Sequence, residues 1–80
     1  MKNNGKWRER IFCDLKMMGG EPVIKGTRVT VAVVVGSMAD GMSVKEILRA
    51  FPKIKEEDIK ACLRYAADSA KGDMQYSIAV

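Results

Sequence analysis

The segment from Ser43 to Pro52 constrains the fold of this 80-residue chain more than any other. Ser43 and Glu46 have the capping-box spacing, in which each side chain accepts a hydrogen bond from a backbone N–H at the helix start. Pro52 ends the helix, because the residue before a proline is pushed out of the helical region. The apolar stripe between these ends, at helical spacing, is Val44, Ile47, Leu48 and Phe51. The sequence therefore predicts a short helix with defined ends.

Helices are predicted on both sides of this one. Thr30 can cap a helix over residues 31–40, which Gly41 is suited to end. Its apolar face is Val31, Val34, Val35 and Met38. A third helix is predicted over residues 56–70, where three acids in the first turn favour the positive end of the helix dipole. Its expected buried face is Ile59, Cys62, Leu63, Ala66 and Ala70. Three helices joined by tight turns are the layout of a helix-turn-helix unit.

The N-terminal part of the chain is predicted to contribute short strands. Residues 10–14 and 22–25 have strand character, and the turn Gly26-Thr27-Arg28 follows them. Residues 1–9 are polar, and we expect them to be flexible. In the tail, residues 71–80, apolar and polar side chains alternate as in a strand that adds to a partner's sheet edge. The expected fold is mainly α, with an N-terminal strand or hairpin and three helices in one domain over residues 10–70.

Composition argues against several classes of protein. The longest apolar stretch, residues 31–35, is far shorter than the roughly 20 residues that a bilayer needs, and the N-terminus lacks the apolar region of a signal peptide. We expect a cytoplasmic protein with reduced thiols, because Cys13 and Cys62 are too few and too distant for a disulfide framework or a zinc site. Histidine is absent, and no glycine loop fits a phosphate. The chain is therefore expected to be non-enzymatic, without metal or cofactor.

The net charge of +4 favours acidic partners. Residues 1–42 carry seven basic and four acidic side chains, whereas residues 43–80 carry seven and six. The excess therefore lies outside the helices that would read a DNA groove. A nucleic-acid partner is compatible with this distribution but does not follow from it.

Two stretches carry a resemblance to a known family. The run GGEPVIKGTRVTV, followed by ADGMSVKEILRAFPKIKEEDIKACLRYAADSA, resembles the antitoxin-like family known as domain of unknown function 433 over residues 10–70. The resemblance implies a homeodomain-like three-helix unit after the strands. It also implies a role in toxin–antitoxin pairs, in which such domains bind a nuclease-like toxin and repress their own promoter. The chain departs from the family at Lys55, where a threonine cap is usual; lysine cannot cap a helix start, and its charge opposes the dipole.

A DNA-binding surface is predicted on the third helix. Measured from Ile59, Lys60, Arg64 and Lys71 fall at about 100°, 140° and 120° around a helix of ~3.6 residues per turn. They form a cationic stripe suited to phosphates, and Lys55, at the helix start that would approach DNA, is predicted to bind DNA as well. Asp68 opposes this interpretation, since it is placed to pair with Arg64 one turn away. The alternative is a solvated face or one that meets a protein.

A partner-binding surface is predicted around Lys25, Arg28 and Trp7. Arg28 can grip phosphate or a carboxylate cluster of a toxin; alternatively, the Gly26–Arg28 turn only satisfies groups within the fold. Trp7 fits either an interface or an aromatic lid. Because a hairpin has unpaired edges, we also expect a homodimer. The resulting prediction is an antitoxin that neutralises a nuclease-like toxin and has promoter DNA as a second ligand; the alternative is a stand-alone helix-turn-helix regulator.

Overall fold

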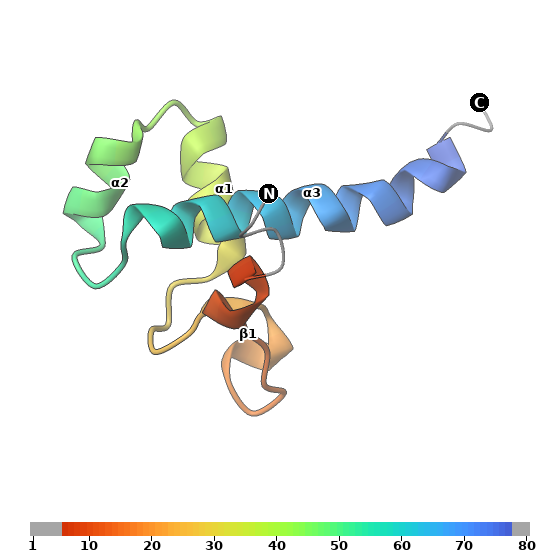
Figure 1. Cartoon of the computed structure of the whole chain (residues 1–80), viewed down its shortest axis with the longest axis horizontal. Coiled ribbons are helices and arrows are strands. Elements are labelled where there is room, and N and C mark those ends of the chain that lie inside the picture. The colour runs from red at the N-terminus through yellow and green to blue at the C-terminus, as the bar shows by residue number, and fades with distance from the viewer. Residues whose placement is uncertain (1–5, 78–80) are drawn as a thin grey trace.

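The computed structural model of the chain describes residues 6–77, and the side chains of residues 6–71. The elements are two 3₁₀ helices, a two-stranded hairpin and three α-helices (Figure 1). In chain order they are η1 (Lys6–Arg10), β1 (Ile11–Phe12), η2 (Met18–Gly20), β2 (Val23–Ile24), α1 (Val31–Ala39), α2 (Val44–Ala50) and α3 (Glu56–Ser77). The predicted mainly-α fold, with a short hairpin before three helices, is confirmed. No helix among residues 6–77 is long and apolar enough to cross a membrane.

The predicted caps of α1 and α2 are confirmed. The Thr30 hydroxyl accepts a hydrogen bond from the Val33 N–H at 3.0 Å. The Ser43 hydroxyl accepts from the Glu46 N–H at 3.1 Å, and the Glu46 carboxylate accepts from the Ser43 N–H at 2.8 Å. Gly41 has a φ of +101°, the left-handed conformation that commonly follows a helix end. These local bonds explain why both helices begin and end where the sequence predicts.

The start of α3 is capped without a capping side chain at Lys55. The Asp58 carboxylate reaches back and accepts a hydrogen bond from the Lys55 N–H at 2.8 Å. This is the second half of a capping box, in which the residue three positions into the helix satisfies the backbone ahead of it. Asp58 therefore satisfies the backbone N–H of the lysine that departs from the family pattern.

The predicted buried face of α3 is wrong at two positions. Leu63 is 40% exposed and Ala70 is exposed, whereas Asp58 is buried. The other buried residues on this helix are Ile59, Ala61 and Cys62. An aspartate tolerates this position because the Arg10 guanidinium donates to it at 2.9 Å. The helix is thus rotated toward the N-terminal segment relative to a face chosen by hydrophobicity alone.

The α3 helix is also longer than predicted. It continues past Ala70 to Ser77, so the strand expected over residues 71–80 is wrong for residues 71–77, and residues 78–80 lie outside the described part. No proline interrupts the chain after Pro52, so a helix that is already formed can extend one residue at a time. In Figure 1 the C-terminal part of α3 projects away from the rest of the domain.

The hairpin pairs β1 with β2 in antiparallel register, Ile11 opposite Ile24 and Phe12 opposite Val23. On its other side, β2 receives the chain that follows the turn, since the Ile24 N–H donates to the Val29 carbonyl at 2.9 Å. Both edges of β2 are therefore occupied. Of residues 1–9, which are expected to be flexible, Lys6–Glu9 form most of η1, and residues 1–5 lie outside the described part.

The hydrophobic core joins the hairpin to all three helices. It consists of Ile24, Val31, Val34, Ile47, Ile54, Ile59 and Cys62. The expected position of Cys62 on an apolar helix face is confirmed, whereas Cys13 is exposed. Burial, followed by the nearby Asp58 carboxylate, raises the pKa of the Cys62 thiol from 9.0 to about 12.

This difference predicts unequal reactivity of the two thiols. The raised pKa of Cys62 lowers its thiolate fraction near neutral pH, and burial keeps reagents from the sulfur, whereas Cys13 is exposed. In the native chain we expect Ellman's reagent to modify Cys13 rapidly and Cys62 only in denaturant. A Cys13→Ser variant, compared in buffer and in urea, isolates Cys62. Rapid modification of this variant in buffer would contradict the buried placement of Cys62.

Candidate functional site

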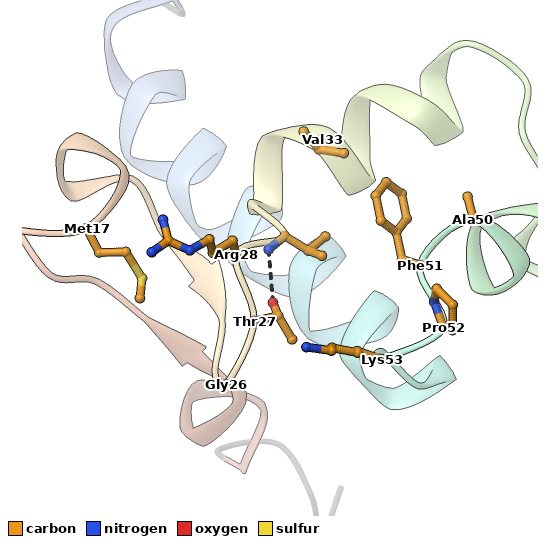
Figure 2. Close-up of a pocket in the computed structure, with 10 residues that line it drawn as sticks. Met17, Gly26, Thr27, Arg28, Val33, Ala50, Phe51, Pro52 and Lys53 are labelled. Carbon is orange, nitrogen blue, oxygen red and sulfur yellow. Dashed lines mark hydrogen bonds between the residues drawn. The ribbon is translucent and has the colours of Figure 1, made fainter.

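In the turn Gly26-Thr27-Arg28, the first two residues shape the backbone and the third exposes its side chain to solvent. Gly26 has a φ of +81°, and a Cβ there would meet nothing within 4 Å, so the backbone angle alone favours glycine. The Thr27 hydroxyl donates to the Ile24 carbonyl at 2.8 Å. It also accepts from the Val29 N–H at 2.9 Å, the bond that is dashed in Figure 2. Arg28 is exposed, and the ion pairs between described residues, Arg8–Asp68 and Arg10–Asp58, do not include it. Glycine and threonine therefore hold the turn and leave the arginine available.

This turn forms one wall of an open groove with a volume of about 820 Å³. The other walls come from the first turn of α1 and from the connection between α2 and α3 (Figure 2). The groove is lined by Met17, Gly26, Thr27, Arg28, Val29, Val33, Ala50, Phe51, Pro52 and Lys53. Segments far apart in the sequence thus meet at one surface, with α1 between them.

The groove combines apolar walls with positive charge. Arg28 and Lys53 are its two charged residues, and no acid lines it. Both side chains are exposed, and neither belongs to an ion pair among residues 6–71. Val33, on the first turn of α1, is 44% exposed and adds apolar surface to the groove. In Figure 2 the Lys53 side chain extends toward the turn, whereas Val33, Phe51 and Ala50 lie toward α1 and α2.

Of the three predicted partner-binding residues, the structure places one in this groove. Arg28 lines it, while Lys25 is exposed beside the turn and Trp7 packs elsewhere. The Trp7 and Tyr65 rings meet edge to face with centroids 6.3 Å apart, and the Arg8 guanidinium lies 4.5 Å from the Trp7 ring centroid. The half-buried Trp7 therefore packs η1 against α3.

Sequence reasoning missed Lys53, Phe51 and Pro52 as site residues. Their signal was present, because a lysine directly after a helix-ending proline lies in a tight, exposed turn. Nothing in the sequence indicates that this turn faces the Gly26–Arg28 turn. That arrangement depends on how α2 packs against α1 and α3.

The four predicted DNA-binding residues lie along α3 or directly before it, all of them exposed: Lys55, Lys60, Arg64 and Lys71. The predicted pair between Arg64 and Asp68 is wrong. Asp68 instead accepts from the Arg8 guanidinium at 3.3 Å. The reason is rotational, since Asp68 lies on the side of α3 that η1 covers. The cationic stripe consequently keeps one more free charge than the sequence indicates.

A partly buried ion pair joins the N-terminal segment to α3. Arg10 Nη1 lies 2.9 Å from Asp58 Oδ1, and the side chains are 40% and 9% exposed. Through Asp58, the same contact reaches the Lys55 N–H at the start of α3. The pair thus connects the end of η1, and with it β1, to the start of α3.

Comparison with known proteins places this architecture in one family. A family model described as "Protein of unknown function (DUF433)" matches residues 11–66. The chain is 41% identical over 59 residues to an uncharacterized protein, y4eO, of Sinorhizobium fredii (strain NBRC 101917 / NGR234); the match covers 74% of this chain and 27% of that protein's length. A crystal structure of a DUF433 member from Anabaena variabilis ATCC 29413 superposes with a TM-score of 0.76 at 24% identity, covering 99% of this chain and 77% of that one. The chain belongs to the DUF433 family.

Proposed function

We propose that the chain is a non-enzymatic, cytoplasmic antitoxin-like protein that binds and neutralises a nuclease-like toxin. The observation that carries the proposal is the groove. Its walls are mostly apolar, its two charged residues are Arg28 and Lys53, and no acid lines it. Nuclease toxins of this kind hold metal ions with carboxylates, and an arginine presented on a rigid turn can pair with such a cluster. The hydrogen bonds of Thr27 supply that rigidity, since they fix the backbone on both sides of the turn.

The proposed assembly includes a homodimer paired through strand edges. Because both edges of β2 are occupied, the outer edge of β1 is the one that the hairpin can offer to a second chain. Phe12, on this strand, is 42% exposed and would be covered by the partner. Two-residue strands are short for pairing, so side chains at the edge must contribute to the dimer.

The direct test is co-expression with the product of the adjacent open reading frame. We expect the two chains to copurify through size exclusion and the neighbour's growth inhibition to disappear. The Arg28→Glu/Lys53→Glu variant should lose both effects, because it reverses the two charges that line the groove. A control variant, Lys45→Glu/Arg49→Glu, makes the same change in net charge at exposed positions of α2 outside the groove and should keep both.

A stand-alone DNA-binding regulator is the second candidate. It is favoured by the engagement of Asp68 with Arg8, which leaves the stripe of Lys60, Arg64 and Lys71 on α3 less compensated. Against it, the first turn of α3 exposes Glu56 and Glu57 where a recognition helix meets base edges. The co-expression test separates the candidates. No complex with the neighbour, together with a promoter-fragment shift that weakens as salt rises, would replace the antitoxin proposal by the regulator.

A further inference from the structure

We infer that the groove between the Gly26–Arg28 turn and the Ala50–Lys53 connection receives a protein segment with acidic residues next to large apolar ones. The inference rests on the proposed function in one respect, that the chain acts by binding another protein. It goes beyond that function by naming the site and the chemistry of its occupant. It requires neither a toxin nor a nuclease.

Charge complementarity identifies the acidic part of the occupant. Arg28 and Lys53 line the same groove from segments that are 25 residues apart in numbering, and no acid lies between them. The two carboxylates that form ion pairs among residues 6–71, those of Asp58 and Asp68, bind Arg10 and Arg8. Arg28 and Lys53 belong to neither pair, so a partner's carboxylate can bind them without displacing an ion pair of residues 6–71. In Figure 2 the Arg28 guanidinium extends toward Met17 and the Lys53 ammonium lies near Thr27, so each can donate charge-assisted hydrogen bonds to a separate carboxylate.

The exposed apolar side chains identify the other part of the occupant. Val33 is 44% exposed, and Phe51 is only half-buried although it packs against the core. Figure 2 shows Phe51 between Val33 and Pro52, on the side of the groove away from Arg28. A leucine or phenylalanine of a partner placed there would remove apolar surface from water on both chains. The groove thus pairs a cationic end with an apolar end, and the expected segment has the complementary order.

The shape of the groove favours a segment of a protein over a small ligand. Its walls are loop and helix-end surfaces that are open to solvent. Small-molecule sites enclose most of their ligand, whereas an interface needs a few anchors within a wider surface. One carboxylate and one apolar anchor meet that need here.

The test selects binding peptides from a displayed library of random 12-residue sequences, using the full chain as bait. We expect the selected peptides to be enriched in aspartate or glutamate beside leucine, phenylalanine or tryptophan. Their affinity, measured by fluorescence anisotropy, should fall at least about tenfold in Arg28→Glu/Lys53→Glu, equivalent to one lost charge-assisted contact. Val33→Asp should weaken them similarly, since it places a carboxylate on the apolar wall. This substitution suits the first turn of α1, so the variant should remain folded.

The control variant Lys45→Glu/Arg49→Glu should bind the same peptides within about threefold, because exposed charges outside the site act only through screened fields. Peptides without acidic enrichment, or with equal affinity for the groove variants, would overturn the inference. Light scattering tests a second copy as the occupant. If Arg28→Glu/Lys53→Glu converts a dimer into a monomer, the groove is a dimer interface and the inference is wrong.

The peptide selection and the co-expression test fail independently. Groove-dependent peptides without a complex with the neighbour would support the site and remove the antitoxin proposal. A stable complex that also forms with Arg28→Glu/Lys53→Glu would support the proposed function but would show that the neighbour binds another surface.

Discussion

Replacement of Asp58 by alanine is expected to lower the free energy of unfolding by about 3 kcal/mol. In the native chain, one carboxylate oxygen accepts from the Lys55 N–H at 2.8 Å and the other from Arg10 at 2.9 Å. The side chain is 9% exposed, so water replaces neither partner readily. The substitution removes a helix cap and an ion pair in one step. Urea unfolding followed by the fluorescence of the single tryptophan, Trp7, measures the loss.

Two companion variants separate the contributions. Asp58→Asn keeps an acceptor for the Lys55 N–H but removes the charge, so we expect its free energy of unfolding to lie between those of the wild type and Asp58→Ala. Arg10→Ala leaves a buried carboxylate without its cation, and we expect a loss of about 2 kcal/mol, tempered by the 40% exposure of the arginine. The double variant Arg10→Ala/Asp58→Ala should lose less than the two single variants together, because they share one interaction. Strict additivity would show that the pair contributes no coupling energy.

Sequence reasoning succeeded where the determining contacts are local. The caps at Thr30 and Ser43 join groups three residues apart, and Gly41 needs only its own backbone angle. Such contacts depend on residue type and spacing, both of which can be read from the chain. The periodic stripes of α1 and α2 were likewise predicted correctly, because their apolar residues leave one choice of buried face.

Sequence reasoning failed where the determining contacts are distant. Asp58 is buried because Arg10, 48 residues earlier, lies beside it. Asp68 turns away from Arg64 because Arg8, 60 residues earlier, binds it. No local pattern contains either partner, so a hydrophobicity-based face placed Leu63 inside and left Asp58 outside. The errors at Asp58 and Asp68 therefore share one cause, the docking of η1 against α3.

In the candidate site, too, local motifs were predicted and distant contacts were not. Arg28 was identified because its turn is a recognisable local motif, whereas Lys53 became a site residue only when α2 brought its C-terminal turn opposite Arg28. Trp7, which was grouped with Arg28 because it precedes the strands, does not line the groove, and its ring contacts Tyr65. A motif thus identifies one wall of a groove, and the packing of the helices supplies the other.

The second large effect concerns that packing. Replacement of Ile47 by alanine is expected to lower the free energy of unfolding by about 3 kcal/mol. Ile47 is fully buried and belongs to the core cluster that joins α2 to the rest of the domain. The seven residues of α2 are too few to form a stable helix alone, so this side chain holds the helix in place. Urea unfolding again measures the change.

Ile47→Val, which removes one methylene, should cost about 1 kcal/mol and serves as the matched control. The two variants also test whether the groove depends on α2. Since α2 leads directly into Phe51, Pro52 and Lys53, hydrogen exchange in Ile47→Ala should accelerate over this connection before the hairpin is affected. Uniform acceleration across the domain would mean that α2 opens only with global unfolding. The two sides of the groove would then form one cooperative unit, and a partner that holds them together would stabilise the whole chain rather than α2 alone.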